Sequence, residues 1–194
     1  MNIIERIKNI LITPKTEWEV IHGETATSQS LLIGYVLPLC IVGAAGSLLQ
    51  GLLFAGVYGV KYFIISGIIG FVASLIAFFV SVIIVDMLAP GFGSEKNMGK
   101  SAQLVAYSGT PFYIAGLLSF IPILGGIIAL AAWAYGIYLM YLGIGPLKKT
   151  PEDKKVVYLI VAYLIMIVLY FILVAILGAI VFAAVGLTAV SFFR

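Results

Sequence analysis

Residues 62–85 decide the fold: they read YFIISGIIGFVASLIAFFVSVIIV and carry no charge. As an α-helix these 24 residues would rise about 36 Å, which exceeds the roughly 30 Å of hydrocarbon in a bilayer. The stretch lies between Lys61 and Asp86, so both of its ends can reach polar surroundings. It therefore predicts a transmembrane helix.

The composition of the whole chain agrees with this prediction. Of the 194 residues, 63% are apolar and only 10% are charged, and the mean hydropathy is +1.20. An average soluble domain is roughly a quarter charged, so this chain lacks the charge to cover a water-facing surface. The composition excludes a soluble globular enzyme and makes the lipid bilayer the main partner of the chain.

Uncharged runs locate the other spans. Lys100 and Lys148 enclose 47 uncharged residues, too many for one crossing, and Pro122 followed by Gly125-Gly126 offers a turn that makes a hairpin. Residues 156–193 contain no proline or charge to fold them back, so length favours one helix, with a helix plus a short re-entrant piece as the alternative. The predicted fold class is all-α, a polytopic transmembrane helical bundle of five spans. The spans are about 31–53, 62–85, 102–120, 123–143 and 156–180.

Residues 1–30 are predicted to precede the membrane domain (31–194) as short amphipathic helices at the cytoplasmic surface. Isoleucines recur at helical spacing from Ile3 to Ile10, and polar residues, Arg6 among them, are assigned to the other face. Thr13-Pro14 ends this helix and starts a second one. Acidic residues interrupt any apolar core that a secretory signal would need.

Basic residues predict the orientation, because lysine and arginine favour cytoplasmic loops. With five spans and a cytoplasmic N-terminus, the far side holds only Lys61 and Arg194. The cytoplasmic side then holds Arg6, Lys8, Lys15, Lys96, Lys100, Lys148, Lys149, Lys154 and Lys155. We therefore expect a protein of the cell inner (cytoplasmic) membrane with its C-terminus on the far side.

Small residues recur at every fourth position along two spans, and such stripes let helix backbones approach closely. They are Gly43, Ser47 and Gly51 on the first span, and Ser66, Gly70 and Ser74 on the second. Packing within one bundle explains them. Contact with a second copy or with another membrane protein is the alternative.

Prolines interrupt the first and third spans in similar surroundings, GYVLP at 34–38 and YSGTP at 107–111. Each proline removes one backbone hydrogen bond, and broken helices at matching positions can mark a substrate site. One interpretation is two tolerated kinks, and the other is a polar cavity in a small transporter or channel. The candidate residues are Tyr35, Pro38, Tyr107, Ser108, Thr110 and Pro111.

Charged residues near the spans give two further candidates. Asp86 follows an apolar span, and acids in a membrane are functional candidates by default, although Lys96 or Lys100 could neutralise it at the interface. The loop before the last span is rich in lysines, which attract anionic lipids and also set topology. These lysines are Lys148, Lys149, Lys154 and Lys155.

No motif points to catalysis. The chain has one histidine, His22, and one cysteine, Cys40, which cannot supply a zinc site or an intrachain disulfide. The net charge of +3 is too mild to indicate nucleic-acid binding. We expect no enzymatic activity, no cofactor and no nucleic-acid partner.

Four strings carry a family likeness: IIERIKNILITPKTEW at 3–18, GYVLP at 34–38, YSGTP at 107–111 and YLMYLGIGP at 138–146. In these the chain resembles the bacterial branch of the Yip1-domain family of five-span membrane proteins. The resemblance implies five spans with a cytoplasmic N-terminus. Eukaryotic members are similar to trafficking factors that bind prenylated Rab GTPases. The expected function is therefore a non-enzymatic multi-pass membrane protein that binds membrane partners or organises the bilayer, with a transporter or channel as the alternative.

Overall fold

A computed structural model gives the backbone of residues 2–58, 60–121 and 123–192 and the side chains of residues 2–54, 64–121 and 123–180. Every regular element in this part of the chain is a helix, which confirms the predicted all-α fold. The far-side position of the C-terminus was predicted from Lys61 and Arg194, and these two side chains lie outside the described residues.

Two short helices open the chain, α1 (Ile3–Ile12) and α2 (Pro14–Gly23). The side chain of Asn2 caps α1 by accepting a hydrogen bond from the Ile4 amide at 3.1 Å. Thr13 ends α1 and Pro14 begins α2, because proline has no N–H to donate but fits the first helical turn. The predicted break between two amphipathic helices is therefore confirmed.

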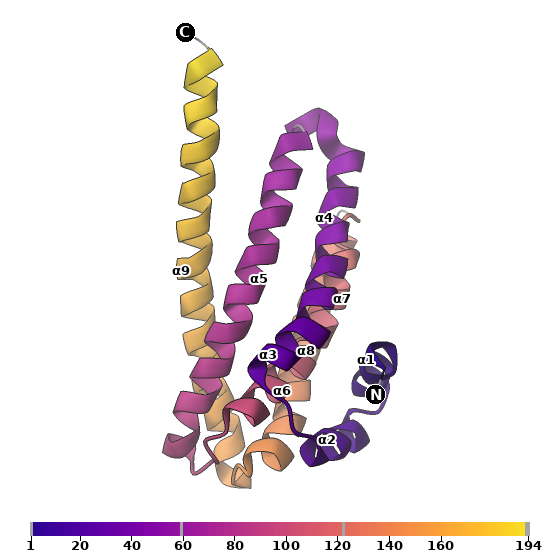
Figure 1. The fold of residues 1–194 in the computed structure, drawn as a ribbon, viewed down its shortest axis with the longest axis vertical. Helices are drawn as coiled ribbons and strands as arrows, with labels where there is room; N and C mark the ends of the chain where they lie inside the picture. Colours follow the sequence, from indigo (N-terminus) through magenta and orange to yellow (C-terminus); the bar gives the residue numbers. More distant parts are fainter. Residues whose placement is uncertain (1, 59, 122, 193–194) are drawn as a thin grey trace.

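Among the remaining helices, the long ones run along the long axis of the molecule, and short ones such as α3 and α6 lie near one end of it (Figure 1). The remaining helices are α3 (Ser28–Leu31), the π-helical η1 (Leu32–Val36), α4 (Leu37–Tyr58), α5 (Val60–Leu88), the 3-10 helix η2 (Ala89–Phe92), α6 (Met98–Ser108), α7 (Thr110–Leu117), α8 (Leu124–Lys148) and α9 (Glu152–Phe192).

Four stretches of the described chain are long and apolar enough to cross a membrane. They are Ser28–Phe54, Ile64–Phe92, Leu124–Lys148 and Glu152–Ile180. The predicted third span, about 102–120, is instead divided between α6 and α7 at Gly109, because Pro111 cannot donate a backbone bond within a continuous helix. The count of five spans stays a prediction.

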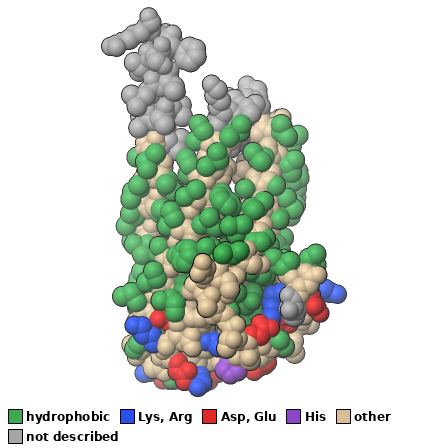
Figure 2. All heavy atoms as spheres, in the orientation of Figure 1, with side chains coloured by type: hydrophobic (Ala, Val, Ile, Leu, Met, Phe, Trp, Pro, Cys, Tyr) green, Lys and Arg blue, Asp and Glu red, His purple; other side chains and the backbone are tan. Residues whose placement is uncertain are grey.

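Charged side chains gather at one end of the molecule (Figure 2). We call it the lysine end and define it by Lys96, Lys100, Lys148, Lys149, Lys154 and Lys155. Helix α2 lies at this end, α1 lies beside it, and α4, α5 and α9 extend toward the opposite end (Figure 1). The core joins the helices near the lysine end, with Val36, Val85, Leu104, Ile144 and Tyr158 among its buried residues.

The small residues of the two predicted stripes have different surroundings. Gly43 lies against α7, where a Cβ atom would sit 3.3 Å from the Tyr113 carbonyl oxygen, and Ser47 packs on Gly67 of α5. Ser74 donates a hydrogen bond to the Phe71 carbonyl. Gly51 is buried, Ser66 is half-buried and Gly70 is exposed. Within this chain Gly43 and Ser47 thus serve contacts of α4 with α7 and α5, respectively.

Candidate functional site: polar clusters at the lysine end

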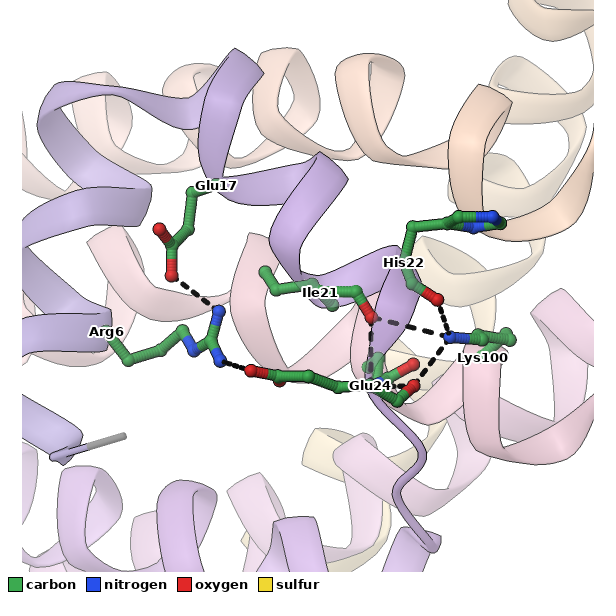
Figure 3. Close-up of polar contacts among 7 residues, drawn as sticks. Arg6, Glu17, Ile21, His22, Glu24 and Lys100 are labelled. Atoms are coloured by element: carbon green, nitrogen blue, oxygen red, sulfur yellow. Dashed lines mark hydrogen bonds and ion pairs between the residues drawn. The ribbon is translucent and has the colours of Figure 1, made fainter.

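An arginine cluster, formed by Arg6, Glu17 and Glu24, ties the two N-terminal helices together (Figure 3). Arg6 is only 5% exposed, and its guanidinium donates to the Glu17 carboxylate at 2.5 Å and also pairs with Glu24. It lies 5.2 Å from the centre of the Tyr107 ring of α6, a cation–π distance. The cluster therefore fixes α1 and α2 against the bundle.

The position of Arg6 corrects the expected pattern of α1. Arg6 was assigned to the polar face, yet it is buried together with Ile10. Three residues after Ile3 and four before Ile10, it falls within the apolar stripe of the helix. That spacing is the signal in the sequence that would have found the cluster.

Lys100 of α6 joins the C-terminal end of α2 to the bundle (Figure 3). Its ammonium donates to the carbonyl oxygens of His22 and Glu24, both at 2.7 Å. Carbonyls at a helix C-terminus carry partial negative charge and attract cations. Partial burial lowers the pKa of Lys100, and the carboxylate of Glu24 opposes that shift. Lys100 thus holds α2 rather than neutralising Asp86.

An Asp86 cluster, formed by Asp86, Ser101 and Lys148, joins the ends of α5, α6 and α8. Asp86 is 2% exposed and Lys148 is 0% exposed, and their charged atoms are 3.1 Å apart. The Ser101 hydroxyl donates to Asp86 at 3.0 Å and accepts from Lys148 at 2.7 Å. Because each group has a partner of matching chemistry, the buried charges are compensated.

The four lysines predicted to contact anionic lipids differ in exposure. Lys148 does not face the surface, contrary to expectation, because its ammonium is used by the Asp86 cluster. Lys155 is mostly buried and pairs with Glu152 at 2.5 Å. Lys149, which pairs with Glu95 at 2.6 Å, and Lys154 are exposed. Two of the four side chains can therefore reach lipid headgroups.

The structure brings together the two proline-containing breaks. Thr110 donates its hydroxyl proton to the Tyr107 carbonyl at 2.7 Å, the carbonyl that Pro111 leaves without its usual helical donor. The Thr110 oxygen, 2.8 Å from the Tyr35 hydroxyl, therefore accepts from it. On the other side of the contact, the π-helical η1 precedes Pro38. In this wide turn the Leu37 amide donates to the Leu32 carbonyl. Ser108 is also buried.

Tyr35 contacts both Thr110 and Tyr107, Pro111 is buried and Pro38 is half-buried. An open pocket lies elsewhere. That pocket, at the lysine end, has a volume of about 510 Å³. Its lining residues are Glu19, His22, Gly145, Pro146, Lys149, Thr150, Glu152 and Lys155. Among the residues that the structure describes, no group of three or more histidine, cysteine, aspartate or glutamate side chains is arranged to hold a metal ion.

Comparison with known families assigns the family. A family model described as the Yip1 domain matches residues 8–176. The chain belongs to the Yip1 domain family. The matched region includes the Asp86 cluster and both proline-containing breaks. No curated protein and no solved structure matches the chain. Family membership and the apolar helices together make this Yip1-domain protein an integral membrane protein.

Proposed function

We propose that this Yip1-domain protein is a non-enzymatic membrane protein that binds a second copy or other membrane proteins through its apolar helix faces and organises the adjoining bilayer with its lysine end. The observation that carries the proposal is the use of its buried polar groups. Arg6, Asp86 and Lys148 each bind other side chains of the same chain. Their contacts hold helices of the chain together, so we assign the binding of partners and lipids to the outer surfaces.

Two of those surfaces differ in chemistry. The outward faces of α5 and α9 expose large apolar side chains, such as Ile68 and Phe171, which suit lipid or another apolar helix. The lysine end exposes Lys149 and Lys154, which suit anionic headgroups. We place this end in the cytoplasm of a cell with the protein in its inner membrane, following the bias of basic residues.

Mass measurement of the full chain tests the partner-binding part of the proposal. In mild detergent and in nanodiscs we expect particles that contain more than one copy of the chain. A strictly monomeric particle in both media would contradict self-association. For the lipid part, Lys149→Gln/Lys154→Gln should weaken binding to anionic lipids, whereas Lys149→Arg/Lys154→Arg, which keeps both charges, is the matched control and should bind like the unchanged protein. Equal lipid binding by all forms would contradict it.

A transporter or channel is the second candidate, and the facing helix breaks of η1 and α6–α7 favour it. Because Tyr35 and Thr110 are bonded to each other in a buried contact, transport would require that contact to open. Pro111→Ala would then change solute flux in proteoliposomes. Under the main proposal the same substitution alters stability slightly and leaves flux at the background of empty vesicles.

A further inference from the structure

Helix α1 exposes apolar side chains next to basic ones. Ile4 is 70% exposed and Ile12 is 68% exposed, and Lys8 lies midway between them in sequence and is also exposed. Helix α2 adds the exposed Val20 and Lys15. Apolar side chains beside lysines are typical of helices that lie between headgroups and acyl chains, where lysine stems reach outward to water.

The depth of α1 agrees with that location. The Tyr135 hydroxyl of α8 donates to the Leu11 carbonyl at the end of α1, at 2.7 Å. Tyr135 precedes Lys148 by 13 residues of α8, which corresponds to about 20 Å along a helix axis. Helix α1 thus lies beside the bundle, above α2 in the view of Figure 1. This level is where the charged zone of the surface gives way to the apolar zone (Figure 2).

Three sets of polar contacts attach α1 and α2 to each other and to the bundle. The arginine cluster binds α1 to α2, Tyr135 binds α1 to α8, and Lys100 binds α2 to α6. Breaking the cluster would strand a buried charge, which is costly. The exposed face of α1 is therefore held at a fixed depth whenever the protein is folded.

The arrangement is also one-sided. Both amphipathic helices lie in the half of the molecule that carries the lysine end, and the described part of the chain has no second pair of this kind in the opposite half (Figure 1). A helix pair inserted in one leaflet enlarges the area of that leaflet alone. Amphipathic helices in this position bind in a curvature-sensitive way.

We infer that α1 and α2 form a built-in wedge whose partner is a lipid surface that is convex on the side of the lysine end. The wedge consists of Ile4, Ile12 and Val20 with the neighbouring Lys8 and Lys15. It acts through the leaflet in which the lysine end sits, so the inference deepens the bilayer-organising part of the proposed function. The area that the inserted side chains occupy is accommodated with less strain where that leaflet is already stretched.

Reconstitution into vesicles of two sizes and one lipid composition tests the wedge. The full chain carries a fluorophore on an N-terminal tag, and a membrane-impermeant quencher reports which molecules have the lysine end outside. For these molecules we expect the density per membrane area to be at least about twofold higher on small vesicles than on large ones. For molecules with the lysine end inside, where that leaflet is concave, the ratio should fall below one. Equal densities in both orientations would overturn the wedge.

A matched pair of double variants assigns the effect to α1. Ile4→Ser/Ile12→Ser should abolish the orientation-dependent enrichment. Ile127→Ser/Leu130→Ser, which changes two exposed side chains of α8, should leave it intact. Loss in both variants, or in neither, would overturn the inference. Because the density ratio does not depend on particle mass, a monomeric protein that still shows enrichment contradicts self-association and supports the wedge.

Discussion

The two ends of the molecule are stabilised by different physics. At the lysine end, buried ion pairs join α1 to α2 and α5 to α8. Toward the opposite end the chain itself covers little of α9: only 11% of the most apolar segment within Glu152–Ile180 is buried. Ile176 and Ile180 are exposed. Lipid is as apolar as these side chains, so covering them with another helix of the chain gains little. Removing one member of a buried pair, by contrast, leaves a stranded charge.

The largest effect is therefore expected at the Asp86 cluster. Asp86→Ala should lower the free energy of unfolding by about 3–5 kcal/mol, because it leaves the Lys148 ammonium buried without its counter-charge. Denaturant titration of the purified protein in detergent measures the change. The double variant Asp86→Ala/Lys148→Met should recover most of the loss, because it removes both charges. A double variant as unstable as the single one would show that the ion pair is not the cause.

Close helix packing should give the next largest effect. At Gly46 of α4 a Cβ atom would overlap the Gly116 carbonyl oxygen of α7. Gly46→Ala should destabilise the fold by about 1–3 kcal/mol, because the two backbones must move apart. Thermal unfolding measures it. The matched control is Gly70→Ala, where a Cβ atom meets nothing within 4 Å, and there stability should be unchanged or slightly raised. Equal effects at both positions would contradict close packing.

The contact between the helix breaks should matter less. Tyr35→Phe removes one hydrogen bond to Thr110 but keeps the ring, whose centre lies 4.8 Å from that of Tyr107. The expected loss is about 1 kcal/mol, the usual net value of a hydrogen bond. Tyr138→Phe, at an exposed tyrosine, is the control for loss of a hydroxyl in the same unfolding assay. If Tyr35→Phe lowered the free energy of unfolding by several times this amount, the Tyr35–Thr110 hydrogen bond would stabilise more of the structure than the two helix breaks alone.

The sequence predicts the parts of this fold that follow from local chemistry. Uncharged runs indicate apolar helices because a backbone in lipid must satisfy its own hydrogen bonds, and Thr13-Pro14 indicates the break between α1 and α2. Partners of buried charges are different. Asp86 pairs with Lys148, 62 residues later, instead of Lys96 or Lys100, because the pairing depends on how α5 and α8 are aligned. Periodicity within one helix carries no information about that alignment.

The smallest effect is expected at an exposed ion pair of the lysine end, and it tests whether the burial of an ion pair or its position at this end determines its contribution to stability. Lys149 and Glu95 also form an ion pair at the lysine end, at 2.6 Å, but their side chains are 64% and 54% exposed. Lys149→Ala should change the free energy of unfolding by less than about 1 kcal/mol, because water already solvates both charges. Raising the salt concentration should reduce even that change, while the cost of Asp86→Ala should persist because the Asp86 cluster is shielded from ions. If both pairs responded equally to truncation and to salt, the stability of the lysine end would depend on its overall charge. If they differ as expected, it depends on the few charges that the helices enclose.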